Sequence, residues 1–210
     1  MITQAIRKNS IILTIFAICT AGLLAVTFQG TKERITASER AAAQKALLEV
    51  VTKHDNDLLA DTKQIPETAL AQLGLKEPEV VNIARVDGHI DAVIVPAIAP
   101  DGYSGAIRLI VGVDRNMNIT GVRVLSHKET PGLGDKVDTK KTNWVHGFNG
   151  KSLTNPSVWA VKKDGGEFDQ FTGATITPRA VVRQVEKVLQ FVDEHKDMLF
   201  ETQTELTESP

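Results

Sequence analysis

Cysteine, tyrosine and methionine are scarce in this 210-residue sequence, which holds one, one and three of them. The single cysteine, Cys19, lies in an apolar run and has no second thiol to pair with, which excludes an intramolecular disulfide and a metal site built on several thiolates. The five histidines are scattered without the spacing of metal ligands, so the sequence predicts no metal site.

A strong net charge is also missing. The chain carries 24 basic and 26 acidic residues, a formal net charge of −2. Only Arg7 and Lys8 among these residues precede the apolar run near the N-terminus, so the remainder holds 22 basic and 26 acidic residues, a formal charge of −4. This balance provides no attraction to phosphate backbones, and nucleic acid is therefore not an expected partner.

The longest apolar run lies close to the N-terminus. Residues 9–31 contain no charged side chain, and residues 11–28 are a largely apolar run of 18. At about 1.5 Å per residue, such a helix spans most of a hydrocarbon core about 30 Å thick. The run is longer than the apolar part of a signal peptide, and no small-x-small cleavage site follows it. The sequence therefore predicts one transmembrane helix over residues 9–31.

Charged residues are distributed unequally around this span. Arg7 and Lys8 precede it without acidic neighbours, whereas charges of both signs follow it. The positive-inside tendency places residues 1–8 in the cytoplasm and the remainder outside, in the periplasm. For a Gram-negative bacterium, this predicts a single-pass protein of the inner membrane.

A helical stalk and connector are expected over residues 32–79. Residues 36–59 are rich in Ala and Leu and follow a possible capping box formed by Thr36 and Glu39. Residues 61–79 carry a short helix between proline and glycine breakers. This segment leads into the main domain.

The domain expected over residues 80–196 is rich in short β-type runs. Hairpin punctuation separates four of them, at residues 80–86, 89–98, 105–113 and 119–125. Residues 158–162 and 167–171 are expected to form a further hairpin. The predicted fold class is α+β, a mainly antiparallel sheet with packed helices. Residues 197–210 are acidic and poor in apolar side chains, which predicts a mobile tail.

One segment places an accessible hydroxyl at the start of a helix. Residues 169–178 read Asp-Gln-Phe-Thr-Gly-Ala-Thr-Ile-Thr-Pro, with Thr177 as the expected N-cap and Pro178 at the first helical position. Apolar residues then recur at helical spacing: Val181, Val185, Val188, Leu189 and Val192. The free N–H groups of a helix start favour a phosphate near Thr175. On spacing alone, a purely structural turn remains the alternative.

The same segment resembles the attachment motif Asp-x-x-(Ser/Thr)-Gly-Ala-Thr of the FMN-binding domain family, in which the last threonine carries FMN through a phosphoester bond. The resemblance implies that Thr175 is the flavinylated residue. The other motif positions are Asp169, Thr172, Gly173 and Ala174. Thr172 stands where serine is more usual, a change that retains the hydroxyl.

A second segment, residues 127–134, reads His-Lys-Glu-Thr-Pro-Gly-Leu-Gly and resembles the His-x-Glu-Thr-Pro-Gly-Leu-Gly segment of this family. Its proline and glycines favour a tight loop with exposed backbone, and its leucine suits an apolar contact with an isoalloxazine ring. The glycine-rich turn 102–105 also resembles a family segment, but no chemistry is assigned to it. The expected flavin-binding residues outside the attachment motif are Glu129, Thr130, Gly132, Leu133, Gly134 and Thr177.

The FMN-binding domain family includes exported domains of RnfG, from Rnf electron-transport complexes, and of NqrC, from sodium-pumping NADH:quinone reductase. Chain length favours the RnfG branch. The resemblance implies a subunit that relays electrons through covalent FMN, in a membrane complex that couples ferredoxin and NAD electron transfer to ion translocation, without substrate chemistry of its own. An NqrC-type subunit, a non-redox scaffold subunit and an enzyme with noncovalent FMN remain alternatives.

The expected acceptor hydroxyl needs help to react. Thr175 is an ordinary alcohol, and no base stands beside it in the sequence. The resemblance implies a flavin transferase of the ApbE type, using FAD and magnesium, as the maturation partner. The other implied partners are the remaining subunits of the membrane complex.

Overall fold

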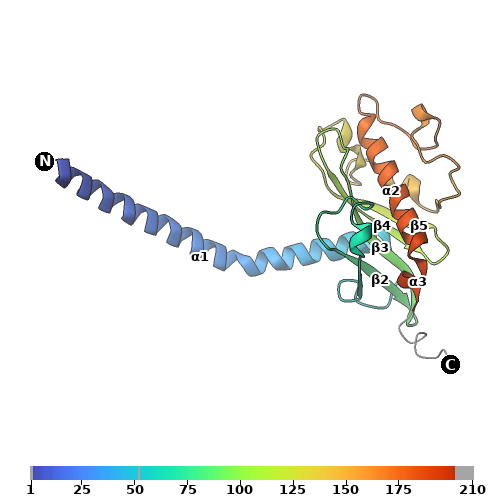
Figure 1. The fold of residues 1–210 in the computed structure, drawn as a ribbon, viewed down its shortest axis with the longest axis horizontal. Coiled ribbons are helices and arrows are strands. Elements are labelled where there is room, and N and C mark those ends of the chain that lie inside the picture. Colours follow the sequence, from blue (N-terminus) through green and yellow to red (C-terminus); the bar gives the residue numbers. More distant parts are fainter. Residues whose placement is uncertain (1, 52, 202–210) are drawn as a thin grey trace. The chain divides into compact units, whose positions relative to one another are not determined.

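The computed structural model describes residues 2–51 and 53–201. The chain divides into two compact units, Met1–Ala43 and Gln44–Pro210. The described part of the first unit is helical throughout, and the second unit holds the sheet and the remaining helices (Figure 1).

The N-terminal helix α1 (Ile2–Val50) continues from the first unit into the second. It contains the stretch Asn9–Lys32, which is long and apolar enough to cross a membrane, with a mean hydropathy of 2.5. This stretch includes the predicted span, and its apolar side chains are exposed, as a lipid-facing surface requires. The predicted capping box at Thr36 and Glu39 is wrong, because both residues lie inside α1, where no helix start exists to be capped.

Five strands form one antiparallel sheet in which each strand pairs with the next along the chain. They are β1 (Thr62–Gln64), β2 (Val80–Val86), β3 (His89–Ala99), β4 (Ile107–Asp114) and β5 (Ile119–Ser126). The four predicted hairpin strands are confirmed as β2 to β5. The edge strand β1 was not predicted, because Thr-Lys-Gln has no alternation of apolar and polar residues. The short helix expected before β2 is η1 (Glu67–Ala69).

Both faces of the sheet are buried. In β3, Val93 and Val95 point toward α2 (Ile176–Glu194), which lies over the sheet in Figure 1. Ala92 and Ile94 alternate with them and point to the opposite face. That face is covered by the end of α1 and the residue after it, through Ala46, Leu47, Val50 and Val51.

Two glycines allow the last turn of α1 to approach the sheet closely. Gly112 and Gly121 are cross-strand partners in β4 and β5. A Cβ on Gly121 would lie 2.7 Å from the Cα of Val50, and one on Gly112 would lie 2.9 Å from the Val50 carbonyl oxygen. The backbone of the helix therefore occupies the space that side chains would fill.

The helix predicted over residues 36–59 ends earlier, at Val50. Asn56, within the predicted helix range, bonds the backbone of β2 instead. Its Oδ1 accepts the Arg85 N–H at 2.9 Å, and its Nδ2 donates to the Ile83 carbonyl at 2.9 Å. These bonds hold the chain after α1 against the sheet.

The hairpin predicted from residues 158–162 and 167–171 is wrong. A single bridge joins the two runs, between Val161 and Phe168, and its sense is parallel. Gly166 packs so tightly on the preceding chain that a Cβ there would lie 1.9 Å from a carbonyl oxygen, so the chain folds back without forming a ladder. The apolar residues that suggested strands enter the core as loop residues: Trp159, Val161, Phe168 and Phe171.

Short 3-10 helices replace regular structure between β5 and α2. They are η2 (Gly134–Val137), η3 (Trp144–Phe148) and η4 (Lys162–Asp164). Their buried side chains, Val137, Val145 and Phe148, join the core on the α2 face of the sheet. This irregular region therefore forms part of the layer that holds both motifs.

The helix after the attachment motif begins earlier than predicted. Ile176 is its first residue and Thr175 is the N-cap, so the assignment of Thr177 as N-cap is wrong. Thr177 instead lies in the first turn with its side chain fully buried, where its hydroxyl bonds the Glu129 carboxylate. The predicted apolar face of α2 is confirmed, since all five of its positions are buried.

The chain after α2 begins as a packed helix. α3 (Lys196–Phe200) buries Leu199 and Phe200 against the core, which ties down residues expected to belong to a mobile tail. Lys63 of β1 adds to this contact by donating from Nζ to the Met198 carbonyl at 2.7 Å. The rest of the predicted tail, residues 202–210, lies outside the described residues.

Candidate functional site

The attachment motif folds into a tight turn at the start of α2. Gly173 has a φ of +81°, which favours glycine, and the Ala174 N–H donates to the Phe171 carbonyl at 3.0 Å. Phe171 is buried beneath this turn, whereas Thr172 and Gly173 are exposed. The small motif residues therefore present backbone, rather than bulky side chains, at the surface.

Aromatic packing holds the beginning of the motif. The Trp144 indole N–H donates to the Asp169 carbonyl at 2.8 Å, and its ring meets Phe171 edge-on with centroids 5.1 Å apart. The Asp169 side chain is exposed and pairs with the Lys162 ammonium at 2.7 Å. Asp169 thus offers a carboxylate at the surface while its backbone is fixed from below.

Thr175 is half-buried, and its hydroxyl does not cap the helix that follows. As the N-cap of α2 it makes no side-chain capping hydrogen bond to the described helix, although threonines at this position commonly make one. The unsatisfied N–H groups of the first turn and the helix dipole favour negative charge next to it. A phosphoryl group on this oxygen would therefore meet donors that are already in place.

The second motif forms a compact loop beside the attachment turn. The N–H groups of Leu133 and Gly134 both donate to the Thr130 carbonyl, at 3.1 and 3.2 Å, and Gly132 has a φ of +78°. Thr130 and Gly132 are exposed, and Leu133 beside them keeps 41% of its surface exposed. Glu129 and Gly134, by contrast, are buried.

The structure brings the two motifs into direct contact. The Thr177 hydroxyl donates to the Glu129 carboxylate across 48 residues of sequence. A Cβ on Gly173 would lie 3.4 Å from Leu133 Cδ2, which is ordinary van der Waals contact. The exposed Leu133 side chain therefore lies next to the attachment turn, where an apolar ring could cover it.

Two residues of this site were not found from the sequence. Ser104, in the glycine-rich turn 102–105 to which no chemistry was assigned, donates its N–H to the Glu129 carboxylate at 2.9 Å. Trp144 lies outside both motifs, yet its indole N–H bonds the motif backbone. Neither role has a local sequence signal, because each depends on a contact between segments about 25 residues apart.

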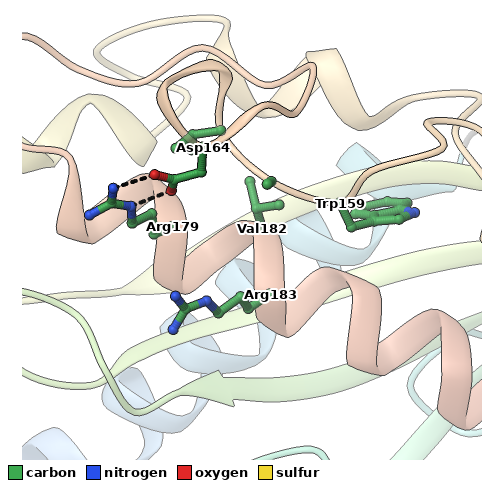
Figure 2. Close-up of a pocket in the computed structure, with 7 residues that line it drawn as sticks. Trp159, Asp164, Arg179, Val182 and Arg183 are labelled. Atoms are coloured by element: carbon green, nitrogen blue, oxygen red, sulfur yellow. Dashed lines mark hydrogen bonds and ion pairs between the residues drawn. The ribbon is translucent and has the colours of Figure 1, made fainter.

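An ion pair ties the loop before the motif to α2 (Figure 2). The Arg179 guanidinium donates to both carboxylate oxygens of Asp164, each at 2.5 Å. These hydrogen bonds hold the pKa of Asp164 below its ordinary value. The pair borders a cavity of about 270 Å³, which Trp159, Val182 and Arg183 also line.

A second hollow, of about 320 Å³, lies beside the start of the motif and includes Trp144, Phe168 and Asp169 in its wall. Thr175 lines neither of these two hollows. Among the described residues, no group of three or more His, Cys, Asp or Glu side chains is arranged to hold a metal ion.

The sequence matches two known families. Residues 1–50 match the RnfG N-terminal region, and residues 102–190 match the FMN-binding domain. The second match contains both motifs and the glycine-rich turn. The two matches together leave only the connector, the first half of the sheet and the C-terminal end of the chain unassigned.

Similar proteins extend over nearly the whole chain. The G subunit of the ion-translocating oxidoreductase complex of Pseudomonas aeruginosa is 48% identical over 198 residues, which cover 93% of this chain and 92% of the relative. The corresponding protein of Vibrio cholerae is 47% identical over 203 residues, covering 93% and 94%. That of Pseudoalteromonas atlantica is 46% identical over 204 residues, covering 96% and 95%. The chain therefore belongs to the RnfG family, the G subunits of ion-translocating oxidoreductase complexes, and contains an FMN-binding domain.

Proposed function

We propose that Thr175 carries FMN through a phosphoester bond and that the protein relays electrons through this flavin. The observation that supports Thr175 is the different state of the three threonine hydroxyls in residues 169–178. Thr177 is buried and bonded to Glu129, and Thr172 lies before the helix cap. Thr175 alone stands at the N-terminus of α2 without a capping bond.

The surroundings of Thr175 suit both ends of FMN. The N–H groups at the start of α2 suit the phosphate, and the exposed side chains of Leu133 and Ile176 provide apolar surface for the ring system. Ile176 keeps 46% of its surface exposed although it is large and apolar. When bound, FMN supplies one- or two-electron transfer, while the protein supplies its position and electrostatic environment.

Attachment requires a flavin transferase that uses FAD and magnesium. The Thr175 oxygen attacks the phosphorus of the FMN half of FAD, so the new Oγ–P bond forms as the pyrophosphate P–O bond breaks. AMP leaves, and the hydroxyl proton passes to a base of the transferase and then to solvent. An external base is needed because an unactivated threonine hydroxyl is a weak nucleophile, and Thr175 stands at the helix cap without a side-chain hydrogen bond to α2.

The setting of this chemistry is a bacterial membrane complex. The relatives are named as subunits of ion-translocating oxidoreductase complexes, which supports an RnfG subunit over an NqrC-type one. In such a complex the protein would pass electrons between partner subunits during ferredoxin and NAD electron transfer coupled to ion movement. Asn9–Lys32 would anchor it in the inner membrane, with Arg7 on the cytoplasmic side and the flavin domain in the periplasm.

Mass spectrometry tests the attachment directly. The full chain is co-expressed with a flavin transferase, and intact and peptide masses are compared for the wild type, Thr175→Ala and Thr175→Ser. We expect the wild type to gain FMN minus water on Thr175, Thr175→Ala to gain nothing, and Thr175→Ser to be modified because it retains a hydroxyl. Wild-type protein without flavin would favour a scaffold subunit, and flavin released by denaturation would favour noncovalent binding.

Protease protection tests the orientation. Protease added outside intact spheroplasts should digest the chain after the membrane stretch and leave the N-terminus protected. Digestion only after the spheroplasts are lysed would place the flavin domain in the cytoplasm and contradict the proposed topology.

A further inference from the structure

We propose that Glu129 is a positioning residue, whose buried carboxylate holds the first turn of α2, and with it Thr175, in the orientation needed for flavin attachment. This inference rests on the proposed function of Thr175. It assigns Glu129 and Thr177 a role different from direct flavin contact. Both residues act through Thr175.

Both oxygens of the Glu129 carboxylate accept hydrogen bonds from groups inside the protein. Its side chain is buried, with the residue 4% exposed. Oε1 accepts the Ser104 N–H at 2.9 Å, and Oε2 accepts the Thr177 hydroxyl. The backbone N–H of Glu129 donates to His127 Nδ1 at 3.1 Å, which fixes the chain on which the carboxylate is carried. Each oxygen has a donor inside the protein, and burial keeps the carboxylate away from the surface.

Glycines make room for this carboxylate. A Cβ on Gly134 would lie 2.7 Å from Glu129 Oε2 and 2.8 Å from the Thr177 oxygen. A Cβ on Gly102 would lie 3.0 Å from Glu129 Oε1. The glycine-rich turn, the second motif loop and the start of α2 therefore converge on one side chain. This convergence gives turn 102–105 a role that the sequence did not reveal.

The hydrogen bond between Glu129 and Thr177 fixes the first turn of α2, which follows Thr175. Thr177 lies in the first helical turn, two residues after Thr175, so fixing it also fixes the N-cap and the direction of the free N–H groups. A hydrogen bond to a carboxylate is stronger than one between neutral groups, and burial excludes competing water. The bond also withdraws the Thr177 hydroxyl from reaction, which leaves Thr175 as the hydroxyl presented at the helix start.

The test removes the hydroxyl without changing the shape of the side chain. Purified full-length Thr177→Val and Thr177→Ser are compared with wild type in transfer assays with flavin transferase, FAD and magnesium. We expect Thr177→Val to lower kcat for transfer at least about tenfold, while the KM for FAD is unchanged because the donor binds to the transferase. Thr177→Ser, which restores the donor, should return kcat to within about threefold of wild type.

A matched core variant separates positioning from general stability. Val188→Ala removes buried volume from the middle of α2 and should lower the unfolding temperature at least as much as Thr177→Val. It should nevertheless be flavinylated at the wild-type rate below that temperature. Equal slowing by Val188→Ala and Thr177→Val, or a wild-type rate in Thr177→Val, would overturn the proposal.

Hydrogen exchange provides a readout that does not need flavin. Thr177→Val should speed amide exchange in the peptide covering the first turn of α2, and Val188→Ala should leave exchange in that turn unchanged. Unchanged exchange in Thr177→Val would overturn the positioning role even if Thr175 is the attachment residue. Wild-type protein that takes no flavin from an active transferase, with the exchange difference present, would instead overturn the proposed function of Thr175.

Discussion

The two faces of the sheet are packed by different means. On one face, the end of α1 lies against small residues, and the glycine pair Gly112 and Gly121 brings helix backbone onto strand backbone. On the other face, α2, α3 and the irregular chain after β5 build a larger core that contains six buried aromatic residues: Phe148, Trp159, Phe168, Phe171, Phe191 and Phe200. Both motifs lie on this second side, where Thr177 of α2 meets Glu129.

The two faces therefore have different roles: one holds the end of α1, and the other carries the candidate site. Close backbone contact on the α1 face leaves little space for side chains. This face therefore holds the end of the helix in one position. The α2 face has long loops and large side chains, which can position exposed groups in specific geometry. Changes on the α1 face should therefore alter stability alone, whereas changes on the α2 face that reach the motifs should alter stability and flavin attachment together.

The largest effect is expected from Phe148→Ala on the α2 face. Phe148 is fully buried, and its ring lies 4.5 Å from Phe168 and 5.3 Å from Trp144, centroid to centroid. Loss of this ring should lower the free energy of unfolding by about 3–5 kcal/mol. It should also slow flavin incorporation, because Trp144 bonds the motif backbone. Denaturant unfolding of the full chain in detergent and the transfer assay measure the two effects. A normal transfer rate would contradict the coupling of core and site.

A smaller effect is expected from Gly121→Ala on the α1 face. The added methyl group would lie 2.7 Å from the Cα of Val50, so the helix end must shift, at a cost of about 1–3 kcal/mol. Flavin incorporation should stay at the wild-type rate. Gly147→Ala is the matched control, since a Cβ there meets nothing within 4 Å, and its unfolding free energy should change by less than about 0.5 kcal/mol. Equal losses in both variants would show that the close approach carries no special cost.

The smallest effect is expected from Asp164→Asn at the surface of the α2 face. Hydrogen bonds from Arg179 lower the pKa of Asp164 in the folded state. A lowered carboxyl pKa stabilises the fold above the ordinary value of 3.8, and this contribution is lost as pH falls through the lower folded-state pKa. The wild type should therefore unfold at a slightly higher temperature than Asp164→Asn at pH 7, with the gap closing below about pH 3.8. If the difference in unfolding temperature between the two proteins did not change with pH, the ion pair would not be its cause.

The regular part of the fold could be predicted because it depends on local patterns. β2 to β5 follow from β-type runs punctuated by turn residues, and α2 follows from apolar residues at helical spacing. The same reasoning failed at residues 158–171, where apolar side chains enter the core from irregular chain and Gly166 forces a tight return. It also missed β1, whose polar residues join the sheet by pairing with β2.

The candidate site was only partly predictable for a similar reason. The motif predicts Thr175 and its neighbours, because a threonine on a small-residue turn before a helix is a local feature. The helix start was misplaced by two residues, since Thr177 looks like a cap until its bond to Glu129 is seen. No sequence pattern indicates that Ser104 would share that carboxylate.

The sequence by itself determined the apolar stretch that is long enough to cross a membrane, the main hairpin strands and the residues that mark the FMN-binding family, because each depends on neighbouring residues. Only the tertiary structure decided which threonine is buried and which is free. That outcome depends on Glu129, 48 residues before Thr177, being carried into hydrogen-bond contact with the first turn of α2. Local patterns specify elements and motifs, whereas burial and long-range hydrogen bonds decide which side chain of a motif remains available to react.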